Sequence, residues 1–170
     1  CEREVVERVT AEGPRRFAEL LRQGARFARL ADGSLALGRE GAHRRRRVAH
    51  AAGDATGREM VRALAAAVRS APHVVILDGA LALDLILDRG RVVGVAAVGR
   101  DGRHLLLTAS EVVLATGGIG GLWRRTTNPP ESIGGGLAMA IRAGAAVADL
   151  EFMQFHPTAL DVAFDRLPLL

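Results

Sequence analysis

A glycine-rich turn in the middle of the chain has the form of a cofactor-binding turn. Residues 112–115, VVLA, are continuously apolar, as in a strand that is covered on both faces of a sheet. Thr116, Gly117 and Gly118 follow at its carboxyl end, which is where ligands bind in open α/β sheets. Glycines there remove side chains that would hold a cofactor away and leave backbone N–H groups facing it. A plain strand that ends in a tight turn is the alternative interpretation.

The most polar stretch, residues 39–50, combines Glu40 and His43 with a run of four arginines. Placed just before a helix, such residues can bind an anionic small molecule or a phosphate backbone. A solvated basic loop is the alternative. Glu40 and His43 lie beside a glycine and an alanine, where the backbone can approach a ligand. Their spacing matches no established ligand pattern, so no metal site is predicted.

A third candidate lies near the end of the chain. Leu150, Phe152, Gln154 and His156 alternate along the sequence, which turns Gln154 and His156 to one face of an extended segment. This face can present the imidazole to a ligand. A hydrogen-bonded histidine in a protein core is the alternative.

Helices are expected on both sides of the polar stretch. Apolar residues at helical spacing predict two short helices within residues 5–21, separated by the Gly-Pro pair at 13–14, and Gly24 is expected to end the second. A further helix is expected where Thr56 and Glu59 fit a capping box, and the Ser-Ala-Pro sequence ends it.

Strands are expected in the remaining parts of the chain. A short one passes through Leu35 and Leu37 after a polar turn, and four more are expected at residues 74–77, 81–87, 92–98 and 105–108. Turns with Asp and Gly connect the later ones, so they predict a β-meander that returns to a parallel sheet at residue 112. The predicted fold class is therefore α/β.

The composition sets limits on function. A chain of 170 residues that is 49% hydrophobic can form a domain with a real core. The net charge of +4 does not imply attraction to nucleic acid, and one cysteine excludes an internal disulfide and fits a cytosolic protein. No apolar run approaches the roughly 20 residues that span a bilayer. Because the chain begins with Cys1 and ends in DRLPLL, it is expected to be an internal fragment.

Two separated blocks resemble one flavoprotein family. Residues 111–160, EVVLATGGIGGLWRRTTNPPESIGGGLAMAIRAGAAVADLEFMQFHPTAL, are similar to the flavoproteins of succinate dehydrogenase, fumarate reductase and aspartate oxidase. Residues 40–59, EGAHRRRRVAHAAGDATGRE, resemble the aspartate oxidase pattern EGGHSxRRxxHAxDATGRE, where succinate dehydrogenases usually differ. The resemblance implies a Rossmann-like FAD/NAD(P)-binding domain with an inserted antiparallel β-meander, without its N-terminal βαβ unit, over residues 1–149. It also implies that 150–170 begin a truncated substrate-capping domain.

The resemblance implies catalytic roles for three residues and cofactor contacts for six. His156 corresponds to the histidine that holds a substrate carboxylate, with Thr158 close by, and Glu40 corresponds to the acidic residue that meets the substrate's α-ammonium group. Residues expected against a non-covalently held FAD are Thr116, Gly117, Gly118 and Gly135, with backbone contacts near the adenine end from Leu81 and Ala82.

Three departures from the family pattern bear on the expected site. Gly135 stands where the family has the aspartate of Gly-Asp-Gly, which contacts the flavin. A charged hydrogen bond is worth roughly 1.5 to 3 kcal/mol, so weaker FAD binding is expected. Ala42 and Arg44 replace a glycine and a serine, and the side chain of Ala42 is expected to crowd the loop that presents Glu40.

The function implied is oxidation of L-aspartate to iminoaspartate, with hydride transfer to FAD and with O2 or fumarate as the electron acceptor. Iminoaspartate would feed quinolinate synthase and NAD biosynthesis, and the catalytic arginines would lie outside this chain. A succinate dehydrogenase or fumarate reductase flavoprotein subunit, which would need an iron–sulfur partner and a membrane anchor, is the first alternative. The second is a non-catalytic basic fragment that binds nucleic acid or an acidic partner. Aromatic residues are only 4% of the chain and none interleaves with the arginines, which disfavours nucleic-acid binding.

Overall fold

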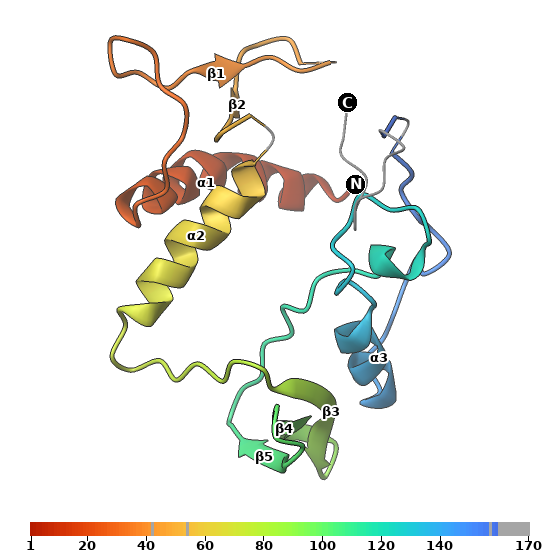
Figure 1. The fold of residues 1–170 in the computed structure, drawn as a ribbon. Helices are drawn as coiled ribbons and strands as arrows, with labels where there is room; N and C mark the ends of the chain where they lie inside the picture. Colours follow the sequence, from red (N-terminus) through yellow and green to blue (C-terminus); the bar gives the residue numbers. More distant parts are fainter. Residues whose placement is uncertain (42, 54, 157, 160–170) are drawn as a thin grey trace. The chain divides into compact units, whose positions relative to one another are not determined.

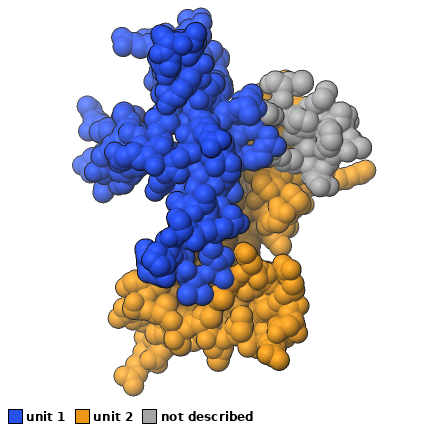
Figure 2. Space-filling view, turned by 60° about the vertical axis from the view of Figure 1, so that its left-hand side comes forward, with its two compact units in different colours: residues 1–76 blue, residues 77–170 orange. Residues whose placement is uncertain are grey.

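The computed structural model describes residues 1–41, 43–53, 55–156 and 158–159. The chain divides into two compact units, Cys1–Ile76 and Leu77–Leu170, which Figure 2 colours separately. The first contains α1, α2 and the short strands β1 and β2, and the second contains β3 to β5, a 3-10 turn and α3 (Figure 1). Each unit positions its own set of candidate residues.

Helix α1, Arg3–Arg22, is one continuous helix of 20 residues with Pro14 inside it. The predicted break into two short helices is therefore wrong. Gly13 lacks the Cβ that normally clashes with the ring of a following proline, so the helical conformation is open to it. The ion pair from Arg16 to Glu12, 3.2 Å long, also spans the proline. Beyond it Phe17 and two leucines pack against the core, and such packing overrides local propensity.

The end of α1 is set by Gly24, as the sequence predicts. Gly24 has φ +88°, a left-handed conformation that side-chain-bearing residues rarely adopt. Its N–H donates to the carbonyl of Leu21, and the N–H of Ala25 donates to the carbonyl of Leu20, both at 3.0 Å. This is the Schellman arrangement, which satisfies carbonyl groups that the helix leaves unpaired.

The polar stretch is carried by a short hairpin. Strand β1, Leu37–Gly38, pairs antiparallel with β2, Val48–Ala49, with Gly38 opposite Val48. The strand predicted through Leu35 and Leu37 is confirmed, although Leu35 contributes only an isolated bridge to Arg29. The hairpin returns the chain to α2, and the loop between its strands contains the candidate Glu40.

Helix α2, Thr56–Arg69, ends at Ser70 as predicted, but the predicted capping box does not form. The N-cap is Ala55, which has no side-chain cap bond. The Thr56 hydroxyl accepts from the N–H of Ala51 at 3.3 Å, and the Glu59 carboxylate accepts from the N–H of Arg26 at 2.6 Å. Both side chains thus satisfy backbone groups outside the helix, which makes them tertiary contacts.

The core of the first unit is small. Its buried residues are joined by partly buried ones from α1, α2 and the hairpin, and the rings of Phe17 and Phe27 lie 4.7 Å apart between centroids. The buried members are Ala25, Phe27, Ala51 and Ala63. This cluster holds α1 and α2 together and supports the hairpin beside them.

The predicted β-meander is confirmed. Strands β3 (Leu81–Asp88), β4 (Arg91–Val98) and β5 (His104–Thr108) form one antiparallel sheet in the order β3-β4-β5. Gly94 is buried on β4, where a Cβ would overlap the carbonyl of Leu107 on β5. The glycine therefore lets the two strands approach at that point.

The strands predicted at 74–77 and 112–115 are not formed. Within the described ranges neither segment pairs with a neighbour, and Val75 and Val113 are 84% and 86% exposed. The apolar patterns are present, but a strand needs a partner for its N–H and C=O groups, and these segments have none in that part of the chain. A short 3-10 turn, Gly120–Leu122, and helix α3, Gly135–Arg142, follow.

Candidate functional site

The predicted glycine turn lies directly against the start of α3. The N–H of Gly134 donates to the carbonyl of Gly118 at 3.0 Å. Gly136 is buried so close to Thr116 that a Cβ there would overlap the threonine hydroxyl. Gly117 has φ +74°, so the turn depends on a residue without a side chain. Four of the six predicted cofactor residues, namely Thr116, Gly117, Gly118 and Gly135, thus belong to one substructure.

This substructure has an exposed face with no side chains over two of its glycines. A Cβ on Gly118 or Gly135 would meet no atom within 4 Å. Helix α3 begins at Gly135, and its N-cap, Gly134, makes no side-chain cap bond. The first N–H groups of a helix lack internal partners and carry partial positive charge. The face therefore suits a flat ligand with anionic or carbonyl groups.

The other two predicted cofactor residues, Leu81 and Ala82, begin β3 and are exposed. They pair with Val98 and Ala97 on one side, and β3 is an edge strand of its sheet. On an edge strand every second residue turns its backbone groups away from the neighbouring strand, so this segment can offer backbone contacts to a ligand.

An ion pair joins β3 to α3. Arg142 donates from Nε to the Asp84 carboxylate at 2.9 Å and from Nη2 to the carbonyl of Leu83, also at 2.9 Å. The hydrogen bond from Arg142 lowers the pKa of Asp84 below its usual range. The contact therefore fixes the helix that begins at Gly135 relative to the strand that contains Leu81.

His156 and Thr158 contact each other through the inner nitrogen of the imidazole. The N–H of Thr158 donates to Nδ1 at 3.2 Å, and the carbonyl of Thr158 also contacts Nδ1. Both contacts use Nδ1, so Nε2 is the nitrogen that can meet a ligand. The two contacts are alternatives: Nδ1 accepts from the N–H when the neutral ring carries its hydrogen on Nε2, and Nδ1 donates to the carbonyl when the ring is protonated. In both states Nε2 carries a hydrogen that it can donate to a carboxylate.

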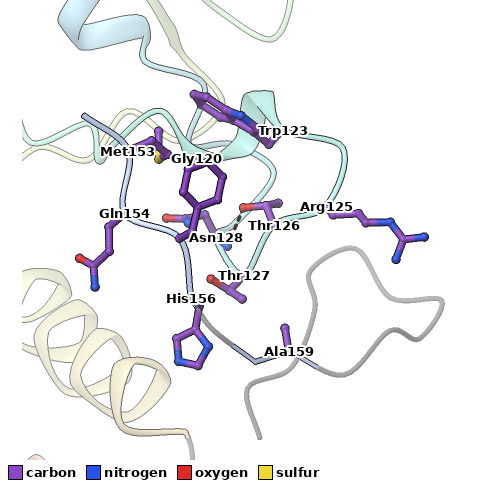
Figure 3. Close-up of a pocket in the computed structure, with 11 residues that line it drawn as sticks. Gly120, Trp123, Arg125, Thr126, Thr127, Asn128, Met153, Gln154, His156 and Ala159 are labelled. Carbon is purple, nitrogen blue, oxygen red and sulfur yellow. Dashed lines mark hydrogen bonds between the residues drawn. The ribbon is translucent and has the colours of Figure 1, made fainter. Parts of the chain in front are cut away.

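His156 lines a cavity of about 200 Å³ between two segments of the second unit. Figure 3 shows the lining side chains, with Asn128 and Thr126 joined by the bond from the Asn128 N–H to the Thr126 hydroxyl, 3.0 Å long. Gln154 lines the same cavity, as its predicted position on the same face requires. The full lining is Gly120, Trp123, Arg125, Thr126, Thr127, Asn128, Met153, Gln154, Phe155, His156 and Ala159.

The segment from Thr126 to Asn128 was not among the predicted site residues. A threonine two residues before an asparagine favours a side-chain turn, and that signal predicts the local bend. Its approach to the turn at 120 depends on a glycine, because a Cβ on Gly120 would lie 2.5 Å from the Asn128 side chain. The packing of these two positions is not visible in the sequence.

Glu40 belongs to the first unit, where its neighbour is His50. The distance from His50 Nε2 to Glu40 Oε1 is 3.9 Å, and the two side chains are 34% and 62% exposed. The arginines at 44–47 are exposed, as in the solvated-loop interpretation. Ala42, which is expected to crowd this loop, lies outside the described residues.

Comparison with known proteins defines the class of this protein. Residues 1–166 match the FAD binding domain family, and because the match covers most of the chain, the chain belongs to that family. It is 50% identical over 169 residues to the L-aspartate oxidase of Mesorhizobium japonicum, covering 99% of this chain and 33% of the relative. For the L-aspartate oxidase of Streptomyces coelicolor the identity is 49% over 170 residues, with coverages of 97% and 29%. The chain thus spans about a third of the length of these curated relatives.

Two solved structures confirm the predicted fold class. A chain of the E. coli quinol fumarate reductase is 32% identical, with a TM-score of 0.79, and covers 84% of this chain and 24% of its own length. A chain of the Mycobacterium smegmatis Sdh1 complex in the apo form is 37% identical, with a TM-score of 0.77 and coverages of 88% and 27%. The order of helices, meander and glycine turn therefore follows the α/β flavoprotein pattern.

FAD is the cofactor that family membership indicates, and the glycine substructure fits it. The open face over Gly118 and Gly135 would be filled by side chains at either position, and the adjoining helix N-terminus offers N–H groups to flavin carbonyls or to phosphate. The one feature that fits less well is the absence of a carboxylate at Gly135.

Proposed function

We propose that the full-length protein is an FAD-dependent oxidase that converts L-aspartate to iminoaspartate. The observation that carries this proposal is His156, which is held through Nδ1 with Nε2 available at a cavity of about 200 Å³. Sequence identity of 49% to 50% to two L-aspartate oxidases supports the choice of substrate.

The residues of this chain bind and orient the substrate. Nε2 of His156 would donate to one substrate carboxylate, with Thr158 fixing the ring, and Glu40 would accept from the α-ammonium group. FAD, when bound non-covalently, supplies the acceptor for the hydride, and O2 or fumarate regenerates it. A substrate with two carboxylates needs further cationic partners, which we place in the part of the protein beyond this chain.

The division of labour along the chain is part of the proposal. Residues 1–149 would belong to the cofactor domain, and 150–170 would begin a domain that covers the substrate. Lid domains of this kind exclude water from a hydride transfer. We place the protein in the cytosol and the fate of iminoaspartate with quinolinate synthase, in NAD biosynthesis. No helix in the described part of the chain is long and apolar enough to cross a bilayer.

The second candidate is a succinate dehydrogenase or fumarate reductase flavoprotein subunit. The likeness to the E. coli and M. smegmatis structures favours it, at identities of 32% and 37%. In such an enzyme the substrate has no ammonium group, so a carboxylate at Glu40 would repel it. A role in nucleic-acid binding has less support, because the exposed arginines have no aromatic side chains between them.

The test uses the full-length protein under anaerobic conditions. L-Aspartate or succinate is added separately, and the flavin absorbance near its visible maximum is recorded. Bleaching by L-aspartate alone is expected. Bleaching by succinate alone would replace the oxidase with the dehydrogenase, and absence of any flavin would mean that the Gly135 site is degenerate. His156→Asn should keep the flavin while weakening the response to L-aspartate.

A further inference from the structure

The side chain of Glu40 has a histidine, His50, beside it that is distant from it in the sequence. β1 and β2 pair so that Gly38 lies opposite Val48, which places His50, two residues further along the chain, diagonally across from Gly38. The imidazole of His50 lies over Gly38, where a Cβ would overlap Nε2. The same Nε2 is 3.9 Å from Oε1 of Glu40. The missing side chain at position 38 is thus what lets the ring reach the carboxylate.

Backbone hydrogen bonds anchor both residues. The carbonyl of His50 accepts from the N–H of Ala28 at 2.8 Å, and the carbonyl of Glu40 accepts from the N–H of His43 at 3.1 Å. These bonds restrain the backbone at both positions. Neither side chain is buried, so the contact between them adds nothing to the hydrophobic core of the unit.

The contact can orient the Glu40 carboxylate and still leave it available to bind a ligand. An unrestrained glutamate loses rotamer freedom when it binds a ligand, and a neighbour that restricts it beforehand reduces that cost. The contact uses Oε1, so Oε2 can accept from an ammonium group. At 3.9 Å the imidazole is an ion-pair partner of the carboxylate when it is protonated, and an ion pair this exposed is weak, so the carboxylate can still bind a cationic group.

We propose that His50 is a positioning residue that holds the Glu40 carboxylate in the orientation that meets the α-ammonium group of an amino-acid substrate, with Gly38 providing the space for its ring. This inference rests on the proposed role of Glu40. It assigns the discrimination between an amino dicarboxylate and a plain dicarboxylate to a pair of residues.

The test is a double-mutant cycle in the full-length holoenzyme with Glu40→Gln, His50→Asn and the double variant. KM and kcat are measured for L-aspartate, and succinate, which lacks the ammonium group, is measured as a competitive inhibitor. Glu40→Gln should raise KM for L-aspartate roughly ten-fold to a hundred-fold, as loss of a charged hydrogen bond predicts. His50→Asn should raise it about three-fold to ten-fold, the range expected for one released side chain.

Three features distinguish positioning from a purely structural role. The inhibition constant of succinate and kcat should stay within about two-fold of the wild-type values in His50→Asn, because succinate offers no ammonium group to Glu40. The His50 substitution should have no further effect in the Glu40→Gln background, since interacting residues are not additive. His73→Asn, at an exposed histidine in the turn after α2, is the matched control and should change nothing.

Gly38→Ala tests the same contact while keeping the imidazole. The added methyl group must displace the ring, and the end of a side chain moves more cheaply than the backbone. The variant should therefore reproduce the His50→Asn pattern with flavin retained, and it decides the matter if His50→Asn fails to fold.

The possible failures are distinguishable. An unchanged KM in both His50→Asn and Gly38→Ala, alongside a raised KM in Glu40→Gln, would overturn the role of His50 and leave the proposed function intact. Additive effects, or equal weakening of succinate, would also overturn it. An unchanged KM in Glu40→Gln would overturn the proposed role of Glu40 and the inference with it.

Discussion

Gly135 is the predicted cofactor residue whose chemistry fits FAD binding least well. It begins α3, beside a glycine turn whose open face suits a flavin, yet it brings no charge to that face. A Cβ at this position would meet no atom within 4 Å. An acidic side chain in the first turn of a helix is also favoured by the helix dipole. Nothing in the local packing therefore prevents a carboxylate there.

Gly135→Asp in the full-length protein should tighten FAD binding about ten-fold or more, because one charged hydrogen bond contributes roughly 1.5 to 3 kcal/mol. The dissociation constant is measured by titrating apoprotein with FAD and following flavin fluorescence. Gly57→Asp makes the same change at the first turn of α2, where a Cβ also meets no atom within 4 Å, and is the matched control. Equal or weaker binding in Gly135→Asp would show that the flavin does not contact this position.

The parts of the candidate site that are formed by residues close together in the sequence could be predicted from the sequence. Thr116 to Gly118 follow an apolar run, and the glycines at 134–136 precede a helix, so both have local signals. His50 has no such signal. It lies ten positions from Glu40, and its approach depends on the register of β1 against β2 and on the absence of a side chain at Gly38. Register is a property of the folded hairpin, which single-sequence patterns do not contain.

At the scale of elements, the end of α1 depends on the backbone of a single residue. Gly24→Ala should lower the free energy of unfolding by about 1 kcal/mol, because alanine is strained at φ +88° while its methyl group would meet no atom. Gly57→Ala, inside α2 and also without steric conflict, should raise it by roughly 0.5 kcal/mol or more. Denaturant unfolding of the full-length variants measures both. A loss in both variants would mean that packing, not backbone conformation, controls these positions.

The contacts that Glu59 makes between α2 and the segment after α1 should weaken at acid pH. Its carboxylate accepts from Arg62 Nε at 2.8 Å and from the N–H of Arg26 at 2.6 Å, and Arg62 also donates to the carbonyl of Gly24 at 2.6 Å. The Arg62 side chain, followed by the Arg26 N–H, lowers the pKa of Glu59 from 4.5 to about 2. The carboxylate therefore stays ionised in the folded protein at pH values where the unfolded chain binds a proton.

Because the folded pKa is depressed, this stabilisation is complete above about pH 4.5 and is lost as the pH falls towards about 2. Glu59→Gln should lower the thermal unfolding midpoint at pH 7, and its difference from wild type should shrink over that acid range. The same substitution in an Arg62→Gln background should show a smaller difference at pH 7. A difference between Glu59→Gln and wild type that does not vary with pH would contradict the pairing.

The elements themselves were predictable to the extent that their signals are local. The meander follows from turns such as Asp88 to Gly90 between apolar strands, and the Gly24 stop was also correct. The break at Pro14 was wrong because Gly13 relieves the clash and the apolar residues beyond it pack on the core. The predictions of strands at 74–77 and 112–115 were wrong for another reason, because the pairing of a strand depends on partner strands elsewhere in a protein.

The described part of the chain buries few apolar side chains for its composition. Hydrophobic residues buried in the described part are Ala25, Phe27, Ala51, Ala63, Ala97 and Met139, four of which are alanines. Larger side chains stay exposed, including Val75 at 84%, Leu106 at 75% and Val113 at 86%. Core positions of stable domains are usually filled by leucine, isoleucine, valine and phenylalanine. We therefore expect this region to need further apolar surfaces, beyond those it contains, for its stability.

The 170-residue chain, purified by itself, should therefore retain no FAD through gel filtration and should bind a hydrophobic dye such as ANS. Buried apolar area is the main source of folding free energy, at about 25 cal/mol per Å², and an apolar segment without a partner contributes almost none. The full-length protein, treated in the same way, should elute with flavin and bind little dye. Flavin absorbance that co-elutes with the isolated chain would contradict this expectation. It would show that the glycine turn and α3 bind FAD without contacts from other parts of the protein.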